Sequence, residues 1–202
     1  YHMGTVWRGE NTQRGRYREF MQCDFDTIGT TSAISDLETV LVVHDLLIAI
    51  GVDRFTIRIN DRRILSGILE VFGLTSKTTH VLRCLDKTGK IPRDTLANEL
   101  QEQGVSVPSV DCLLGLGELS GSATDVLSEL HNLVGESAVG VQGVEAVGAL
   151  LNGLAEVGVA DDRITLDPSI ARGLDYYTGI VLESFLDELP DLGSVCSGGR
   201  YD

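Results

Sequence analysis

Residues 20–26 alternate between apolar and polar positions, as expected of a half-buried β-strand. The two sets of side chains are Met21, Cys23 and Phe25 against Gln22, Asp24 and Asp26. We predict that the strand buries the apolar set and offers the amide and the two carboxylates to a cavity. Three such groups on one face are costly to bury unless they bind something. An edge strand with a polar face turned to solvent is the alternative.

Similar patterns predict the other elements of the first part of the chain. Residues 1–8 read as a strand that leads into a loop over residues 9–15, and residues 53–60 alternate again. The run Ser35-Asp36-Leu37-Glu38 has the spacing of a capping box, which predicts the start of a long apolar helix that stops at Gly51. Another helix is predicted over residues 62–72.

The middle of the chain has helical patterns without a strong strand signal. Pro92 and Gly104 bracket one predicted helix, and two more are predicted over residues 123–134 and 144–157. Residues 76–159 hold five Lys/Arg and eleven Asp/Glu, a net charge of −6. His80 and His131 stand alone there, so surface or capping roles are expected for them. We predict that residues 76–160 form a small helical domain inserted into a β-rich one.

Strand patterns return after this block, over residues 163–166, 174–185 and 195–197. The strands before and after the block are expected to share one sheet, because neither group alone has enough strands to bury its faces. The prediction is an α+β fold in which residues 1–75 and 161–202 form one domain around the helical insertion.

Composition narrows the class of protein. The 202 residues are 43% apolar and 23% charged, and no apolar run is long enough to span a bilayer. The net charge of −14 argues against a protein that coats nucleic acid. Four cysteines are scattered singly, which favours a reducing compartment over a zinc site or a disulfide framework. No secretory leader is visible, so a cytoplasmic protein is expected.

Two segments combine arginines, carboxylates, aromatic residues and glycines in ways that ordinary core or surface does not require. Between Arg8 and Arg18 the sequence has four arginines and a single acidic residue, Glu10. The glycines in this stretch would let the backbone approach a phosphate closely. The second segment runs from Ala171 to Gly179 and holds Arg172, whose fork suits a carboxylate or phosphate. A structural Arg–Asp pair with two tyrosines packed in a sheet is the alternative interpretation.

These segments resemble the histidyl-tRNA synthetase family of class II aminoacyl-tRNA synthetases. The first is similar to that family's form of motif 2, and the second to its histidine-binding motif. The matching residues are Arg8-Gly9-Glu10, Gly15-Arg16-Tyr17-Arg18-Glu19-Phe20-x-Gln22-x-Asp24-x-Asp26, Ala171-Arg172-Gly173-Leu174-Asp175-Tyr176-Tyr177-Thr178-Gly179 and Ser197-Gly198-Gly199-Arg200-Tyr201-Asp202. The resemblance implies a class II antiparallel sheet flanked by helices, with the helical block in the place of the family's insertion domain.

The resemblance also implies an activity, in which histidine and ATP form histidyl-adenylate and histidine then passes to its tRNA. Arg8 would bind the α-phosphate of ATP, Glu10 would lie near adenine or ribose, and Phe20 would stack on adenine. Arg172 would reach both the histidine carboxylate and the α-phosphate, so Arg8 and Arg172 are the expected catalytic residues. Mg²⁺ is expected with ATP, although no clear carboxylate cluster is present to hold it.

The histidine pocket follows from the same resemblance. Gln22 would hold the backbone end of the amino acid, while Asp26 and Tyr177 would bond the two imidazole nitrogens. Tyr176 would shape the pocket and Tyr201 would close it. A carboxylate opposite an imidazole N–H discriminates well, because an apolar isostere would leave it unpaired.

Several parts of the family pattern are absent or altered. Asn11-Thr12 stands where many relatives have a basic residue and a proline. The first and third class II motifs, the acidic loop for the histidine ammonium and the anticodon-binding domain are not found. The chain also begins without Met and stops inside a predicted strand. We therefore expect an excerpt of a longer homodimeric enzyme, which catalyses little by itself.

Two rival functions share this fold. The first is the non-catalytic regulatory subunit of ATP phosphoribosyltransferase, and the second is a synthetase-like domain in a kinase or scaffold. Neither needs Arg8 and Phe20 for ATP, so the synthetase is favoured. Within the acidic helical block, Lys87, Lys90 and Arg93 are the cations predicted to contact the tRNA acceptor stem.

Overall fold

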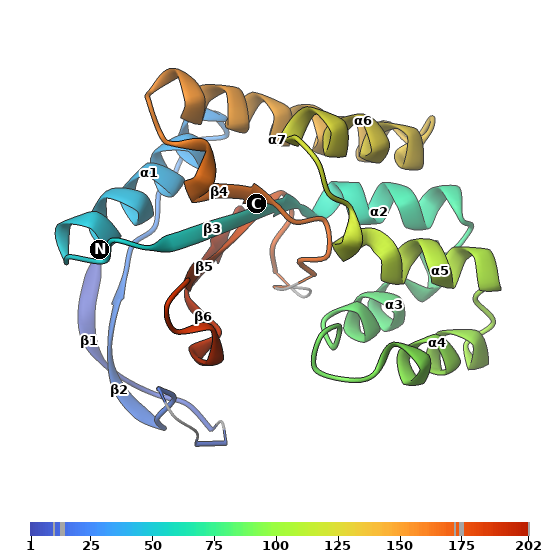
Figure 1. The fold of residues 1–202 in the computed structure, drawn as a ribbon, viewed down its shortest axis with the longest axis horizontal. Coiled ribbons are helices and arrows are strands. Elements are labelled where there is room, and N and C mark those ends of the chain that lie inside the picture. The colour runs from blue at the N-terminus through green and yellow to red at the C-terminus, as the bar shows by residue number, and fades with distance from the viewer. Residues whose placement is uncertain (10, 13–14, 172, 174–175, 202) are drawn as a thin grey trace.

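The computed structural model describes residues 1–9, 11–12, 15–171, 173 and 176–201. Two predicted site residues, Glu10 and Arg172, therefore lie outside the described residues. Figure 1 shows an α+β fold in which a sheet crosses the centre of the molecule and helices cover it. The predicted fold class is confirmed.

The central sheet has the strand order β4-β3-β5-β6. Its strands are β3 (Phe55–Asp61), β4 (Ile164–Leu166), β5 (Ile180–Leu186) and β6 (Ser194–Gly199). The predicted sharing of one sheet by segments on both sides of the helical block is confirmed for β3. The sheet is not wholly antiparallel, because β3 and β4 run parallel. The long helical crossover between them allows this pairing, which a short turn cannot make.

The N-terminal hairpin pairs β1 (His2–Trp7) with β2 (Glu19–Asp24) and forms a separate two-stranded sheet within the described residues. The prediction of a single sheet is therefore wrong for these two strands. The predicted burial of Met21 and Cys23 is also wrong, since both are exposed and Met21 keeps 68% of its surface. Alternation shows which residues share a face of a strand, but not which face meets the rest of the protein.

Helix α1 (Ile34–Ala49) follows the hairpin and ends before Gly51, whose φ of 84° stops it as predicted. The predicted capping box is wrong, because the N-cap is Ala33 and no side chain caps the helix. The hydroxyl of Ser35 donates to the carbonyl oxygen of Ser32 instead. Helix α2 (Arg62–Val71) is capped by the carboxylate of Asp61, which accepts from the Arg63 amide.

Residues 76–159 are helical as predicted, and their strand content is one isolated bridge between Thr88 and Ile91. The α-helices are α3 (Thr78–Leu85), α4 (Arg93–Glu102), α5 (Val107–Gly115), α6 (Ala123–Val134) and α7 (Ala138–Glu156). Short 3₁₀ turns complete the chain at η1 (Thr75–Lys77), η2 (Leu116–Glu118), η3 (Asp161–Arg163) and η4 (Pro190–Leu192). Helix α7 begins six residues earlier than its predicted start, because Ser137 rather than a later residue caps it.

Helices α6 and α7 pack closely on α2, and α7 also contacts α1 and β3. Figure 1 shows α3, α4 and α5 at the end of the molecule away from the hairpin. Buried residues of α2, α7 and β3 belong to one hydrophobic core with those of α3 and α4. The separate insertion domain of residues 76–160 stays a prediction.

Helices α2 and α7 approach each other at glycines. A Cβ atom added at Gly67 would lie 2.4 Å from the Cα of Gly140, and one added at Gly143 would lie 2.8 Å from the backbone nitrogen of Ile64. Ser137, at the start of α7, donates to the carboxylate of Glu70 on α2 at 2.5 Å. The two helices therefore meet with backbone against backbone over part of their length.

Among the described residues, α7 is the one helix long and apolar enough to cross a membrane by length and composition. Its Val144, Val147, Leu150 and Leu154 are buried in this fold. The contacts with α2, α6 and β3 account for the apolar character of α7 as a core helix.

Candidate functional site

A cavity of about 1230 Å³ lies between the hairpin, the start of α1, the loop before β5 and strands β5 and β6. Every predicted site residue that the structure describes lines it: Arg8, Phe20, Gln22, Asp26, Tyr176, Tyr177 and Tyr201. These residues come from segments at opposite ends of the sequence. The fold thus brings the two chemically unusual segments to one place, while the role of each residue stays a prediction.

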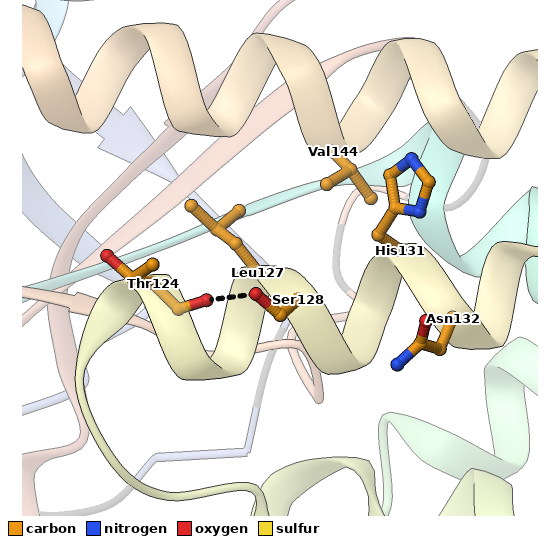
Figure 2. Close-up of a pocket in the computed structure, with 6 residues that line it drawn as sticks. All are labelled: Thr124, Leu127, Ser128, His131, Asn132 and Val144. Atoms are coloured by element: carbon orange, nitrogen blue, oxygen red, sulfur yellow. Dashed lines mark hydrogen bonds between the residues drawn. The ribbon is translucent and has the colours of Figure 1, made fainter.

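A second hollow of about 390 Å³ lies between α6 and α7 (Figure 2). Its lining is Thr124, Leu127, Ser128, His131, Asn132 and Val144. The hydroxyl of Ser128 donates to the Thr124 carbonyl oxygen within the helix, as Figure 2 shows. This hollow holds none of the predicted site residues, and His131 is its single ionisable side chain, so the larger cavity is the candidate site.

A chain of hydrogen bonds follows the polar face of the hairpin. Arg8 Nη2 donates to Gln22 Oε1 at 2.7 Å, and Gln22 Nε2 donates to Asp24 Oδ2 at 2.8 Å. The Arg8 guanidinium also lies 5.2 Å from the centre of the Phe20 ring. Strand pairing produces this arrangement, because Phe20, Gln22 and Asp24 are alternate residues of β2 and so share a face.

Hairpin pairing continues past the end of β1 and carries Arg8 into the cavity. The Arg8 amide donates to the Arg18 carbonyl oxygen at 2.8 Å. The guanidinium therefore stands on an ordered hairpin next to an amide and an aromatic face. A fork of N–H donors in this setting can hold a phosphate, while the amide and Asp24 beside it can hold a zwitterion.

Asp26 and Tyr201 meet across the cavity although 175 residues separate them. The Tyr201 hydroxyl donates to Asp26 Oδ1 at 2.9 Å. This hydrogen bond raises the pKa of Tyr201 above its usual value, because an ionised phenol could no longer donate to the carboxylate. The second carboxylate oxygen of Asp26 has a lone pair toward which an imidazole N–H could donate.

Tyr176 and Tyr177 lie in a turn rather than in a strand. The predicted strand over residues 174–185 begins only at Ile180, so its predicted start is wrong and the two tyrosines precede the strand. Their rings contact each other edge to face, with centroids 4.3 Å apart. The left-handed φ of 67° at Gly173 and the hydrogen bond from the Tyr177 amide to the Gly173 carbonyl oxygen make this turn.

Two glycines make room for the Tyr177 ring. A Cβ atom at Gly173 would lie 1.9 Å from Tyr177 Cδ2, and one at Gly199 would lie 2.7 Å from its Cγ. The ring therefore packs against the backbone at both glycines. A side chain at either position would collide with the ring.

Burial raises the pKa of Tyr177 to about 12, with smaller contributions from Tyr176 and the Asp26 carboxylate. Tyr177 is therefore a neutral phenol at physiological pH and can donate a hydrogen bond. A tyrosine in the unfolded chain ionises near pH 10. The raised pKa thus contributes stability that is present below about pH 10 and is lost as pH rises through about 12.

We expect Tyr177 to ionise well after an ordinary tyrosine in a titration followed by tyrosinate ultraviolet absorbance. Tyr177→Phe should remove this late step and leave the earlier ones in place. Loss of a step near pH 10 in the variant would contradict the environment described for Tyr177.

Two residues at the site make contacts that the sequence did not predict. Asp24 holds the Gln22 amide, and its place two residues from Gln22 on one strand face was the available signal. Arg200 ties the end of β6 to the start of α1 through Asp36. No local pattern indicates that pair, because its members are 164 residues apart.

Each cation predicted to contact tRNA pairs with a carboxylate of its own block. Lys87 Nζ lies 2.7 Å from Glu99 Oε1, Lys90 Nζ 3.4 Å from Asp86 Oδ2, and Arg93 Nη1 3.0 Å from Glu118 Oε1. Lys90 and Asp86 also line the large cavity. Their contact with tRNA stays a prediction.

No cluster of three or more His, Cys, Asp or Glu side chains that could hold a metal ion occurs among the described residues.

This chain is similar to a family model and to curated relatives. A family model described as histidyl-tRNA synthetase matches residues 1–202. The histidine–tRNA ligase of Rhodopirellula baltica is 55% identical over 100% of this chain and 46% of its own length. That of Wolinella succinogenes is 45% identical over the same shares. The chain thus spans about half the length of the curated relatives it matches.

Solved structures agree with the sequence comparison. The crystal structure of histidyl-tRNA synthetase from Nostoc sp. PCC 7120 has a TM-score of 0.89 and 32% identity, over 99% of this chain and 46% of that one. A Bacillus halodurans structure titled ATP phosphoribosyltransferase regulatory subunit/histidyl-tRNA synthetase has a TM-score of 0.81 over 99% of this chain and 50% of that one. Its 23% identity supports the fold alone. This chain belongs to the histidyl-tRNA synthetase family.

Proposed function

We propose that this chain forms the histidine- and ATP-binding part of a histidine–tRNA ligase. The observation that supports it most is the meeting of Arg8, Gln22, Asp26, Tyr177 and Tyr201 around one cavity. The cavity combines a phosphate-binding type of side chain with groups suited to an imidazole. No covalent nucleophile is needed, because adenylation depends on positioning and on neutralisation of charge.

In the proposed first step, an oxygen of the histidine carboxylate attacks the α-phosphorus of ATP. The bond from that phosphorus to the bridging oxygen breaks, pyrophosphate leaves, and histidyl-adenylate remains. Arg8 would neutralise charge on the α-phosphate, with Phe20 stacked on adenine and Glu10 near the nucleoside. Arg172 would contact the histidine carboxylate and the same phosphate, as the family resemblance implies.

A guanidinium carries five N–H donors, so Arg8 would contact the phosphate from its place beside Gln22. The Gln22 amide, which Asp24 holds, would bind the backbone end of histidine.

The imidazole would lie between Asp26 and Tyr177. One ring N–H would donate to the Asp26 carboxylate, which Tyr201 orients, while the Tyr177 hydroxyl would donate to the other nitrogen. Tyr176 packs edge-on against Tyr177 and would shape the same wall. The raised pKa of Tyr177 supports its role as donor.

In the second step a ribose hydroxyl at the end of the tRNA would attack the carbonyl carbon of the adenylate, and AMP would leave. Histidine, ATP with Mg²⁺ and a histidine-specific tRNA are the proposed substrates. A homodimer in the cytoplasm is the proposed setting. Contact between the tRNA acceptor stem and Lys87, Lys90 and Arg93 is part of the same proposal.

The test is histidine-dependent exchange of labelled pyrophosphate into ATP by a full-length enzyme that carries this sequence. Exchange is expected with histidine and not with glutamine or phenylalanine. Asp26→Asn should reduce the preference for histidine over an analogue without ring nitrogens by about 10²-fold or more, because the pairing that rejects the analogue is lost.

The regulatory-subunit alternative makes a different prediction for the same experiment. Such a protein would bind histidine in a calorimetric titration without catalysing exchange. Histidine binding without exchange would therefore overturn the proposed ligase.

A further inference from the structure

The guanidinium of Arg200 connects two chain segments at the edge of the cavity, its own and residues 32–36. Its Nε lies 3.1 Å from Asp36 Oδ1, and its Nη2 lies 3.1 Å from Asp36 Oδ2. Nη2 also donates to the Ser32 carbonyl oxygen at 2.9 Å and to Ser35 Oγ at 3.0 Å. Arg200 thus binds both side-chain and backbone atoms at the beginning of α1.

The backbone of Arg200 is fixed as firmly as its side chain. Its amide donates to the Ile180 carbonyl oxygen at 2.8 Å, and its carbonyl oxygen accepts from the Thr178 amide at 2.8 Å. The side chains of Arg200 and Asp36 are 14% and 16% exposed. At this degree of burial, an ion pair with bidentate geometry is rigid and weakly screened by salt.

The ion pair of Arg200 and Asp36 joins the two chain segments that carry Tyr201 and Asp26. Tyr201 is the next residue after Arg200, and residues 27–35 connect Asp26 to Asp36. The Tyr201 hydroxyl then bonds Asp26 at 2.9 Å. A closed loop of contacts therefore runs from Arg200 to Asp36, along the chain to Asp26, and through Tyr201 back to Arg200.

We propose that Arg200 and Asp36 are positioning residues of the histidine pocket. Their ion pair sets the distance between the β6 end, which carries Tyr201, and the segment that carries Asp26. Neither side chain needs to touch the substrate. This inference rests on the proposed function, because it assigns Asp26 and Tyr201 to recognition of the imidazole.

The contacts of the Ser35 and Asp36 side chains support the proposal. Ser35 has the spacing of a capping box with Glu38, and Asp36 follows it in the sequence, yet neither Ser35 nor Asp36 caps α1. Instead both bind Arg200. The polar residues at this helix start therefore anchor a distant strand rather than the helix itself.

Lysine could not replace this arginine without loss. Three different acceptors, on Ser32, Ser35 and Asp36, surround one planar fork. An ammonium is a compact charge and does not reproduce that geometry. Removal of the Asp36 charge would take a charged partner from a largely buried guanidinium, so the segment is expected to shift.

The experiment compares Asp36→Asn and Arg200→Lys with the unmodified full-length enzyme in pyrophosphate exchange. We expect the KM for histidine to rise about tenfold or more, with the KM for ATP changed by less than about twofold. Preference for histidine over thienylalanine, whose five-membered ring has no nitrogen, should fall as well. Asp36→Glu keeps the charge and should restore part of the histidine affinity.

Asp167→Asn is the matched control. This carboxylate also pairs with an arginine, Arg58, at 3.2 Å and has a side chain 14% exposed, but it does not line the cavity. It should leave the preference for histidine unchanged. An equal loss of preference in the control and in Asp36→Asn would overturn the proposal, because general destabilisation would then explain both.

A double-mutant cycle tests the route of the effect. If Asp36 acts through Tyr201, then Asp36→Asn combined with Tyr201→Phe should raise the KM for histidine by clearly less than the product of the two single effects. Fully multiplicative effects would overturn the proposal. Absence of exchange in the unmodified enzyme would instead count against the proposed ligase function, so the two failures are distinguishable.

Discussion

Arg8→Ala in a full-length enzyme is expected to reduce the rate of histidine-dependent pyrophosphate exchange by about 10²- to 10³-fold. The guanidinium stands next to Phe20 and Gln22 at the cavity, where a phosphate would develop charge in the proposed reaction. Loss of one preorganised charged donor in such a site has effects of this size. Steady-state exchange at saturating ATP measures kcat, and histidine titrations measure KM.

Arg58→Ala provides a matched control for this experiment. Arg58 also lies over a phenylalanine ring, that of Phe185 at 4.6 Å, and also bonds a polar side chain, that of Asp167. It does not line the cavity, so the exchange rate should stay within about threefold of the unmodified value. A similar small effect of Arg8→Ala would contradict the assignment of Arg8 to the phosphate.

Gly67→Val should destabilise the protein by about 3 kcal/mol or more, because a side chain at this position has no space. Its first carbon alone would lie 2.4 Å from the Cα of Gly140, which is backbone and cannot rotate away. Helices α2 and α7 would have to separate, with loss of packing along their shared surface. Thermal unfolding is expected to shift downward by about 6–12 °C for a protein of this size class.

Gly148→Ala tests whether the effect comes from this contact rather than from glycine in a helix. Gly148 lies on the same helix, and an added Cβ there would meet only Leu127 Cδ1 at an ordinary 3.7 Å. Alanine should therefore leave stability unchanged or raise it by up to about 1 kcal/mol. Equal destabilisation by the two substitutions would show that the close approach of the helices is not the cause of the lost stability in Gly67→Val.

The candidate site was largely predictable because its side chains lie in three short motifs. Arg8, Phe20, Gln22 and Asp26 fall within one hairpin and its exit, Tyr176 and Tyr177 within one turn, and Tyr201 follows β6. The resemblance of these motifs to a family supplied the expected roles. The structure adds their convergence on one cavity and the hydrogen bonds of Asp24 and Arg200, which no motif assigned.

The errors in prediction share a physical origin. The buried face of β2, the start of β5 and the partners of Ser35 and Asp36 all depend on segments far away in the sequence. Alternation at Met21 and Gln22 is the same whichever face turns inward. The sequence around Ser35 and Asp36 is likewise the same whether these residues cap a helix or bind Arg200.

The sequence by itself determined the elements whose signals are local: the helix over residues 123–134, the stop at Gly51, and the alternation of β2 and β3. These follow from backbone preferences and periodicity over a few residues. Only the tertiary structure decided the parallel pairing of β3 with β4, the contact of Gly67 with Gly140 and the bond between Asp26 and Tyr201. Each of these depends on the packing of segments separated by some 70 to 175 residues, and packing is a property of the whole chain.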